Sequence, residues 1–141
     1  MSPQIEEAWR ALRLADRDIY AFNVLSDDDD AHLSVVCFHA QQAVEKSLKA
    51  VLFALQIEFK RTHNLLELAA LLCQNGGDPP LTDESLLRLN PYAVTYRYDD
   101  RDIELVTRED AALWMNDMRA WAEVQVGNAA EAEHADDERH D

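Results

Sequence analysis

The sequence predicts an all-helical protein, an up-and-down bundle of four to five helices with an irregular loop before the last one. Two observations support this prediction. Apolar residues recur at steps of three and four along three long segments, which is the spacing of one face of a helix. Only three glycines and four prolines occur in 141 residues, which leaves few places for the tight turns of many short strands. A chain of this length buries enough surface to fold as one domain without disulfides.

The first predicted helix covers residues 3–25. Ile5, Leu12 and Ile19 belong to a single apolar stripe. Pro3 suits the first helical position, because its missing N–H has no partner within the helix there. Four aspartates at positions 27–30 then end the pattern, since short carboxylates compete for backbone hydrogen bonds. They lack the glycine and distal glutamate of a calcium-binding EF-hand loop, so we expect a turn.

The second predicted helix covers residues 31–57 and has the clearest pattern in the sequence. One face is small and aliphatic, with the seam Leu33, Val36, Ala40, Val44, Ser47, Val51 and Leu55. The other face carries Gln42, Glu45, Lys46 and Lys49. Lys49 follows Glu45 by four residues, the orientation that favours an ion pair along a helix. We expect half of this helix to lie in the core and the polar half to be available to a ligand or partner.

Two shorter helices are predicted next. The third begins near Asn64 and ends before Gly76, because glycine readily adopts the left-handed conformation that terminates helices. The fourth begins after Thr82, a suitable capping residue, and runs to Leu89. Residues 96–106 combine aromatic and alternating charged residues with no helical period, so we expect a partly extended loop.

The last predicted helix begins after Thr107, which suits a cap. Its expected core stripe is Ala111, Trp114, Met118, Trp121 and Gln125, flanked by Met115 and Ala122. From residue 127 the sequence becomes acidic and rich in alanine, and such a segment buries too little apolar surface to offset its ordering entropy. The predicted organisation is therefore a helical bundle over residues 1–126 and a disordered acidic tail over residues 127–141.

Composition narrows the classes of partner. The net charge of −15 repels a phosphate backbone, so nucleic-acid contact requires a local basic patch, and DNA is not expected. No apolar run approaches the roughly 18 residues of a membrane span and no signal peptide is recognisable, so no membrane is expected and the predicted location is cytoplasmic. Cys37 and Cys73 lie apart in apolar helical patterns, which indicates buried free thiols rather than a metal site, and we expect no cofactor.

Standard catalytic motifs such as GxSxG, HExxH, the P-loop and GxGxxG are missing. What remains is a dispersed polar set in three segments. The candidate ligand-binding residues are Gln42, Glu45, Lys46, Lys49, Arg61, His63, Arg97, Tyr98 and Arg101. Cations among them can hold phosphate, and a histidine can transfer protons. Each also has a structural alternative: the lysines as a solvated helix face, His63 as a helix-terminal hydrogen bonder, and Arg97 as a counterion for nearby carboxylates.

Three segments resemble landmarks of the HEPN family (higher eukaryotes and prokaryotes nucleotide-binding). They are FHAQQAVEKSLKAVL at residues 38–52, THNLL at 62–66 and YRY at 96–98. Their order and spacing match over roughly residues 5–125. The resemblance implies a helical bundle that is usually a homodimer and is often paired with a minimal nucleotidyltransferase in toxin–antitoxin modules. It also implies that a nucleotide or RNA binds in a groove at the dimer interface.

One departure from the family pattern leaves enzyme activity open. Catalytic HEPN ribonucleases carry an arginine followed after four to six residues by a histidine, and no arginine here has that partner. The leading hypothesis is a nucleotide- or RNA-associated module, the dimeric partner of a minimal nucleotidyltransferase. One alternative is a metal-independent endoribonuclease toxin in which His63, Arg97 and Lys46 supply proton transfer and charge. Another is a non-catalytic interaction bundle whose polar landmarks only hold the fold.

Overall fold

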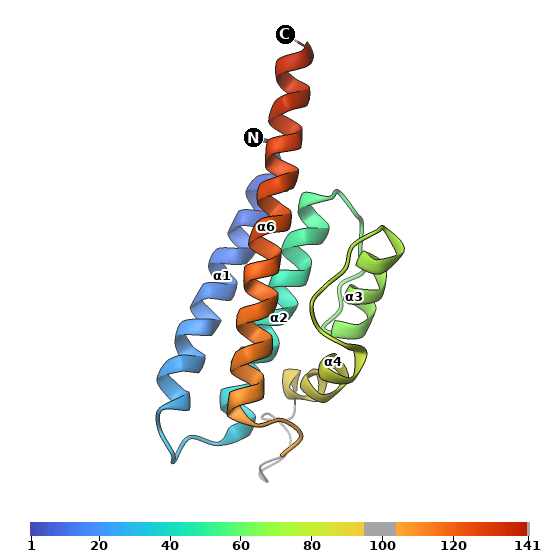
Figure 1. The fold of residues 1–141 in the computed structure, drawn as a ribbon. Coiled ribbons are helices and arrows are strands. Elements are labelled where there is room, and N and C mark those ends of the chain that lie inside the picture. Colours follow the sequence, from blue (N-terminus) through green and yellow to red (C-terminus); the bar gives the residue numbers. More distant parts are fainter. Residues whose placement is uncertain (95–103, 141) are drawn as a thin grey trace.

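The computed structural model describes residues 1–94 and 104–140, and within those ranges it contains helices and no strand. The elements are α1 (Pro3–Ser26), α2 (Leu33–Ala54), α3 (Leu65–Gln74), α4 (Asp83–Leu89), the 3-10 helix η1 (Asn90–Ala93) and α6 (Arg108–His140). Three long helices, α1, α2 and α6, lie side by side, with α3 and α4 beside α2 (Figure 1). The predicted all-helical bundle is confirmed. Helices α2 and α6 run in the same direction, opposite to α1 (Figure 1).

Polar side chains fix where several helices begin. The Ser2 hydroxyl accepts a hydrogen bond from the backbone N–H of Ile5, at the start of α1. Asn64 does the same for two N–H groups of α3, and Thr82 for one of α4. The Thr107 hydroxyl accepts from the N–H of Asp110 at 3.0 Å. These caps satisfy N–H groups that have no partner within the helix, which is why the predicted starts of these helices agree with the structure.

Helix α2 forms the centre of the bundle, because α1, α6, α3 and η1 all pack against it. Its buried residues include Val36, Ala40, Val44 and Val51, as the sequence predicts. The helix ends at Ala54 rather than near residue 57, so Leu55 is exposed instead of extending the predicted seam. Its C-terminal end is closed by the N–H of Ile57, which donates to the carbonyl of Leu52.

The predicted core stripe of helix α6, with its flanking residues Met115 and Ala122, is confirmed in part. Its buried residues are Ala111, Met115, Met118, Ala122 and Val126. Trp114, Trp121 and Gln125 are only partly buried, and the two tryptophans pack at the edge of the core. Both stripes satisfy the same helical period, so periodicity did not distinguish them. Small and flexible side chains fit closely against α2, whereas the indole rings fit at the margin.

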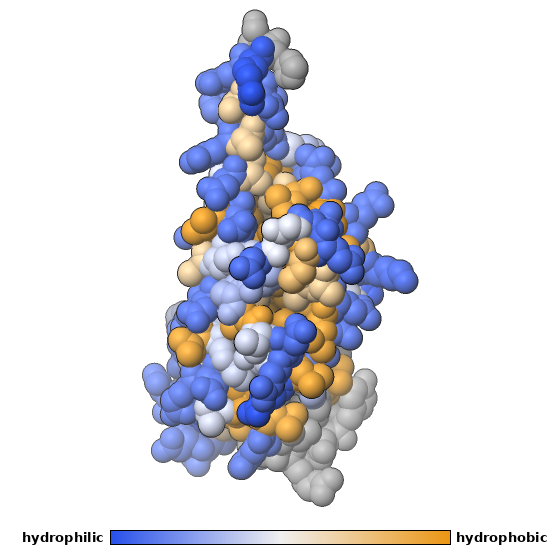
Figure 2. All heavy atoms as spheres, turned by 45° about the vertical axis from the view of Figure 1, so that its right-hand side comes forward, coloured by the Kyte–Doolittle hydropathy of each residue, from blue (hydrophilic) through white to orange (hydrophobic). Residues whose placement is uncertain are grey.

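The segment expected to be a disordered tail is helical. Helix α6 continues through Gly127 to His140 and projects beyond the other helices (Figure 1). Two features missed in the sequence account for this. Alanine has the highest helix propensity and recurs through the segment, and the Glu133 carboxylate accepts hydrogen bonds from the Ser2 N–H at 2.6 Å and from the Ser2 hydroxyl at 2.7 Å. Polar side chains dominate the projecting end (Figure 2).

Two further findings concern the burial of the cysteines and the apolar character of the helices. Cys37 is buried as expected, but Cys73 is exposed. Its position is off the buried stripe of α3, which consists of Leu65, Leu68, Ala69 and Leu72. Within residues 1–94 and 104–140, no helix combines the length and apolar character needed to cross a membrane.

Candidate functional site

One partly exposed stripe of α2 carries most of the predicted site. It consists of His39, Gln42, Lys46, Lys49 and Phe53, which are spaced three or four residues apart and are all half-buried. We call this set the α2 stripe. It lies between α1 on one side and the chain joining α2 to α3 on the other, because Lys46 contacts Asp18 of α1 and Phe53 contacts Phe59 of that chain. The face of α2 predicted to be available is therefore reduced to a narrow strip.

Glu45 forms the centre of a hydrogen-bonded cluster beside the stripe. Its side chain is only 4% exposed, although the sequence placed it on the available face. One carboxylate oxygen lies 3.2 Å from Lys49 Nζ and the other 3.0 Å from His63 Nδ1. The Gln41 amide donates to the carboxylate at 3.3 Å and also to the backbone carbonyl of His63. Burial of a carboxylate is tolerated here because these donors replace water.

The cluster gives His63 a defined orientation. An ionised carboxylate only accepts hydrogen bonds, so the proton of a neutral His63 ring lies on Nδ1, facing Glu45. The His63 side chain is 64% exposed, and Nε2 has no hydrogen-bond partner in the described part of the chain. The ring therefore presents a basic nitrogen toward solvent. The same contacts also tie the segment before α3 to α2, so the cluster has a structural role as well.

A second carboxylate, Asp18 of α1, contacts the other end of the stripe. It is buried, with one oxygen 3.0 Å from His39 Nδ1 and the other 2.5 Å from Lys46 Nζ. Sequence reasoning missed Asp18, His39 and Gln41. A signal was available for Asp18, because it falls between Ala15 and Phe22 on the buried side of α1. A charged residue at such a position needs a partner.

The structure brings Gln42, Glu45, Lys46, Lys49 and His63 together on one side of the bundle. Two distinct carboxylates hold the two lysines: Asp18 pairs with Lys46, and Glu45 pairs with both Lys49 and His63. Arg61 lies farther along, near the end of α2. The remaining predicted residues, Arg97, Tyr98 and Arg101, lie outside the described residues.

A groove continues from the stripe beyond the end of α2. Its volume is about 750 Å³, and its lining residues are Gln4, Lys49, Leu52, Phe53, Gln56, Ile57, Glu58, Phe59 and Arg61. The rings of Phe53 and Phe59 meet edge to face, with centroids 5.3 Å apart and planes at 66°. Arg61 is exposed and makes no ion pair with any described residue. Lys49 and Arg61 were predicted as ligand-binding residues from the sequence, whereas the aromatic and amide side chains between them were not.

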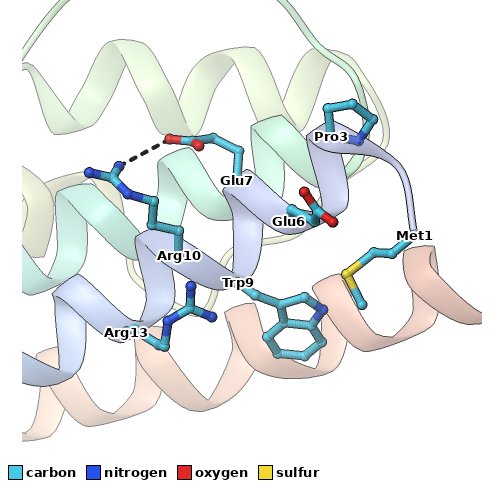
Figure 3. Close-up of a pocket in the computed structure, with 7 residues that line it drawn as sticks. All are labelled: Met1, Pro3, Glu6, Glu7, Trp9, Arg10 and Arg13. Carbon is cyan, nitrogen blue, oxygen red and sulfur yellow. Dashed lines mark hydrogen bonds and ion pairs between the residues drawn. The ribbon is translucent and has the colours of Figure 1, made fainter.

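A separate hollow of about 560 Å³ lies at the start of α1 (Figure 3). Trp9 points toward α6 there, with Arg13 beside it, and Arg10 pairs with Glu7 at 3.2 Å. Two glutamates offset two arginines in this hollow, and none of the predicted site residues lines it. No group of three or more His, Cys, Asp or Glu side chains within residues 1–94 and 104–140 is arranged to hold a metal ion.

The geometry can be compared with known proteins. The family model for the HEPN domain matches residues 8–128. This chain belongs to the HEPN family. A crystal structure of ST0689, an archaeal HEPN homologue, is similar, with 22% sequence identity, coverage of 92% of this chain and 99% of that chain, and a TM-score of 0.44. A comparison with curated proteins gives no match. The HEPN match spans α2 and the segment before α3, which together carry the site described above.

Proposed function

We propose that this HEPN protein binds a nucleotide or RNA along the α2 stripe and acts as the dimeric partner of a minimal nucleotidyltransferase in a toxin–antitoxin type module. The observation that carries the binding proposal is that the half-buried Lys46 and Lys49 of the α2 stripe lie on the same side of the bundle as the exposed His63. The whole chain has a net charge of −15, so phosphate binding requires a local group of cations, and the α2 stripe supplies two lysines.

Both lysines already form ion pairs with carboxylates, and each can still contact a phosphate. Lys46 and Lys49 keep 29% and 19% of their side-chain surface exposed while contacting Asp18 and Glu45. An ammonium group has three donors, so one can face the carboxylate while another contacts a phosphate oxygen. The carboxylates then hold the ammonium groups in place before the ligand arrives, which lowers the entropy lost on binding.

Titration with ATP and with a short single-stranded RNA at two salt concentrations tests the binding proposal. We expect Lys46→Gln to weaken binding by about tenfold, because a charge-assisted contact contributes roughly 1.5 kcal/mol or more. His63→Gln should weaken binding only where the imidazolium form is present, because Nε2 donates to phosphate only in that form while Nδ1 faces Glu45. Arg88→Gln is the matched control, since Arg88 also pairs with a carboxylate but lies on α4. Failure of the wild-type protein to bind either ligand would favour the pure interaction bundle instead.

The proposed dimer and partner have their own support. Large apolar side chains are exposed on the outer faces of α1 and α6, namely Tyr20, Val24, Leu113 and Val124. Exposed apolar area of this kind suits a protein interface. Light scattering at micromolar concentration should give about twice the chain mass of 16.1 kDa. Co-expression with a nucleotidyltransferase from a neighbouring gene should yield a stable complex. A protein that purifies as a monomer without the nucleotidyltransferase would contradict both the dimer and the partner.

The Glu45–His63 pair favours a second candidate, the metal-independent endoribonuclease. In this reaction His63 Nε2 takes the proton of an RNA 2′-hydroxyl, whose oxygen attacks the adjacent phosphorus. The 5′-oxygen leaves with a proton from a donor such as Lys46, and the products end in a 2′,3′-cyclic phosphate and a 5′-hydroxyl. Cleavage that persists in EDTA and is abolished in His63→Gln supports this candidate. Intact RNA after prolonged incubation with the wild-type protein excludes it for that substrate.

A further inference from the structure

The groove at the end of α2 has the chemistry of a nucleotide subsite. We propose that it holds one nucleotide unit, with the base against Phe53 and Phe59 and the phosphate between Lys49 and Arg61. This inference rests on the proposed function, because it assigns the position of a ligand that the α2 stripe alone leaves unspecified. The unit is either a free nucleotide or one residue of a single-stranded RNA whose chain continues along the stripe.

Size and aromatic character support the base position. A volume of about 750 Å³ lies within the range of about 300–1,000 Å³ typical of small-ligand sites. Phe53 and Phe59 are both half-buried, so each ring keeps exposed surface while their edge-to-face contact holds both in place. Every nucleobase has an aromatic face that can stack on such a ring, and stacking does not depend on the base sequence.

The cations mark the phosphate position. Lys49 belongs to both the groove lining and the α2 stripe, and Arg61 also lines the groove. Arg61 has no carboxylate partner among the described residues, so its guanidinium can hold a phosphate through two parallel hydrogen bonds without breaking an existing pair. Glu58 is the one acidic side chain that lines the groove. Its carboxylate can accept a hydrogen bond from a ribose hydroxyl or a base amino group.

Gln56 supplies an independent observation. It is the one described non-glycine residue with positive φ, at 58°, and it follows the end of α2 where helices usually place glycine. A side chain in this conformation is strained, and such strain is concentrated at functional sites. Gln56 lines the groove, where its amide can pair with the edge of a base.

Because the backbone of Gln56 is strained, its replacement by glycine should change stability and binding in opposite directions. Gln56→Gly should raise the Tm by about 2–4 °C, because glycine adopts positive φ without steric cost. The same variant should bind a fluorescent single-stranded oligoadenylate several-fold more weakly, because it loses a base contact. Arg61→Gln and Phe59→Leu should each weaken binding by roughly tenfold. Competition with unlabelled ATP distinguishes a free nucleotide from RNA as the preferred ligand.

Arg13→Gln is the matched control, because Arg13 is also an exposed arginine beside a hollow and without an ion pair in the described part of the chain. The groove assignment is overturned if Arg13→Gln weakens binding as much as Arg61→Gln, or if all three groove variants bind normally while Lys46→Gln does not. In that second case the proposed function stands. If the wild-type protein binds neither RNA nor ATP, the proposed binding function and this inference both fail.

Discussion

The α2 stripe and the projecting end of α6 are both rich in charged residues, yet they hold those charges differently. Around the stripe, two buried carboxylates reach partners on other elements: Asp18 of α1 contacts Lys46, and Glu45 contacts His63 in the chain before α3 as well as Lys49 on its own helix. At the end of α6 the pairs are local and exposed, such as Arg139 with Asp136 three residues away. The number of charged residues in a region therefore does not show where a site lies. A buried charged side chain that requires a partner on another element is a better indicator of a site.

The largest expected effect comes from removing the buried carboxylate. Glu45→Ala should lower the free energy of unfolding by about 2–3 kcal/mol, because Lys49 and Gln41 lose their acceptor in a partly buried place. Glu138→Ala, which removes an exposed carboxylate near the end of α6, should change it by no more than about 0.5 kcal/mol. Urea unfolding followed by circular dichroism measures both. Equal losses of unfolding free energy in the two variants would mean that charges around the α2 stripe and at the end of α6 contribute alike to stability.

A pair of aspartates two residues apart on α1 sharpens the comparison. Asp18→Asn should cost about 1–2 kcal/mol, because buried Asp18 contacts both His39 and Lys46. Asp16→Asn should cost less than about 1 kcal/mol, since Asp16 is exposed although it contacts Arg119 at 2.8 Å. The same unfolding measurement applies to both variants. A larger loss for Asp16→Asn would mean that burial does not set the strength of these pairs.

Removing residues 128–141 should have a smaller effect. We expect the truncated protein to fold, with a Tm within about 2–4 °C of full length. The helix in this segment is mostly solvent-exposed, and its described contacts with the bundle are limited to partly buried Ala129 and Ala130 and the Glu133 contact with Ser2. Thermal unfolding by circular dichroism provides the measurement. A fall well beyond this range would show that the end of α6 stabilises the whole bundle.

The smallest expected effect is a pH dependence at Glu133. Hydrogen bonds from the Ser2 hydroxyl, followed by the Ser2 N–H and the N-terminal charge, lower the pKa of this carboxyl below 4.5 despite a smaller opposing effect of desolvation. The contact therefore stabilises the fold above about pH 4.5 and is lost as pH falls through the lower folded-state pKa. The Tm difference between wild type and Glu133→Gln should be slight near neutral pH and shrink as the pH falls through the folded-state pKa. A difference that grows on acidification contradicts this assignment.

The fold was predictable from the sequence because its signals are local. Helical periodicity and capping residues such as Asn64 and Thr107 act within a few positions, and the structure confirms the helices they predict. The site was predictable only in part. The sequence singled out Glu45, Lys46, Lys49 and His63, but which carboxylate meets which cation depends on how α1 and α2 pack. No spacing along the chain encodes the contact between Asp18 and Lys46.

The predictions that were wrong also concern features that depend on packing between elements. The core stripe of α6 was misplaced only at Trp114, Trp121 and Gln125, because neighbouring positions have the same period and the choice between them depends on the shape of α2. The end of α6 was expected to lack structure because its composition gives no apolar face, whereas its alanines and its contact with Ser2 favour a helix. The groove was not predicted, because Phe53, Phe59 and Arg61 line the same groove only after the chain turns at the end of α2.

The central position of α2 has a consequence for hydrogen exchange. Amide protons exchange slowly where local opening requires most of the core to come apart. Helix α2 is covered by α1, α6, α3 and η1, so its amides around Val44 and Leu48 should be among the last to exchange, opening only with global unfolding. The amides near the end of α6 should exchange through fraying. The residues of the stripe are thus attached to the slowest-opening backbone in the protein, and a ligand would meet them already in place.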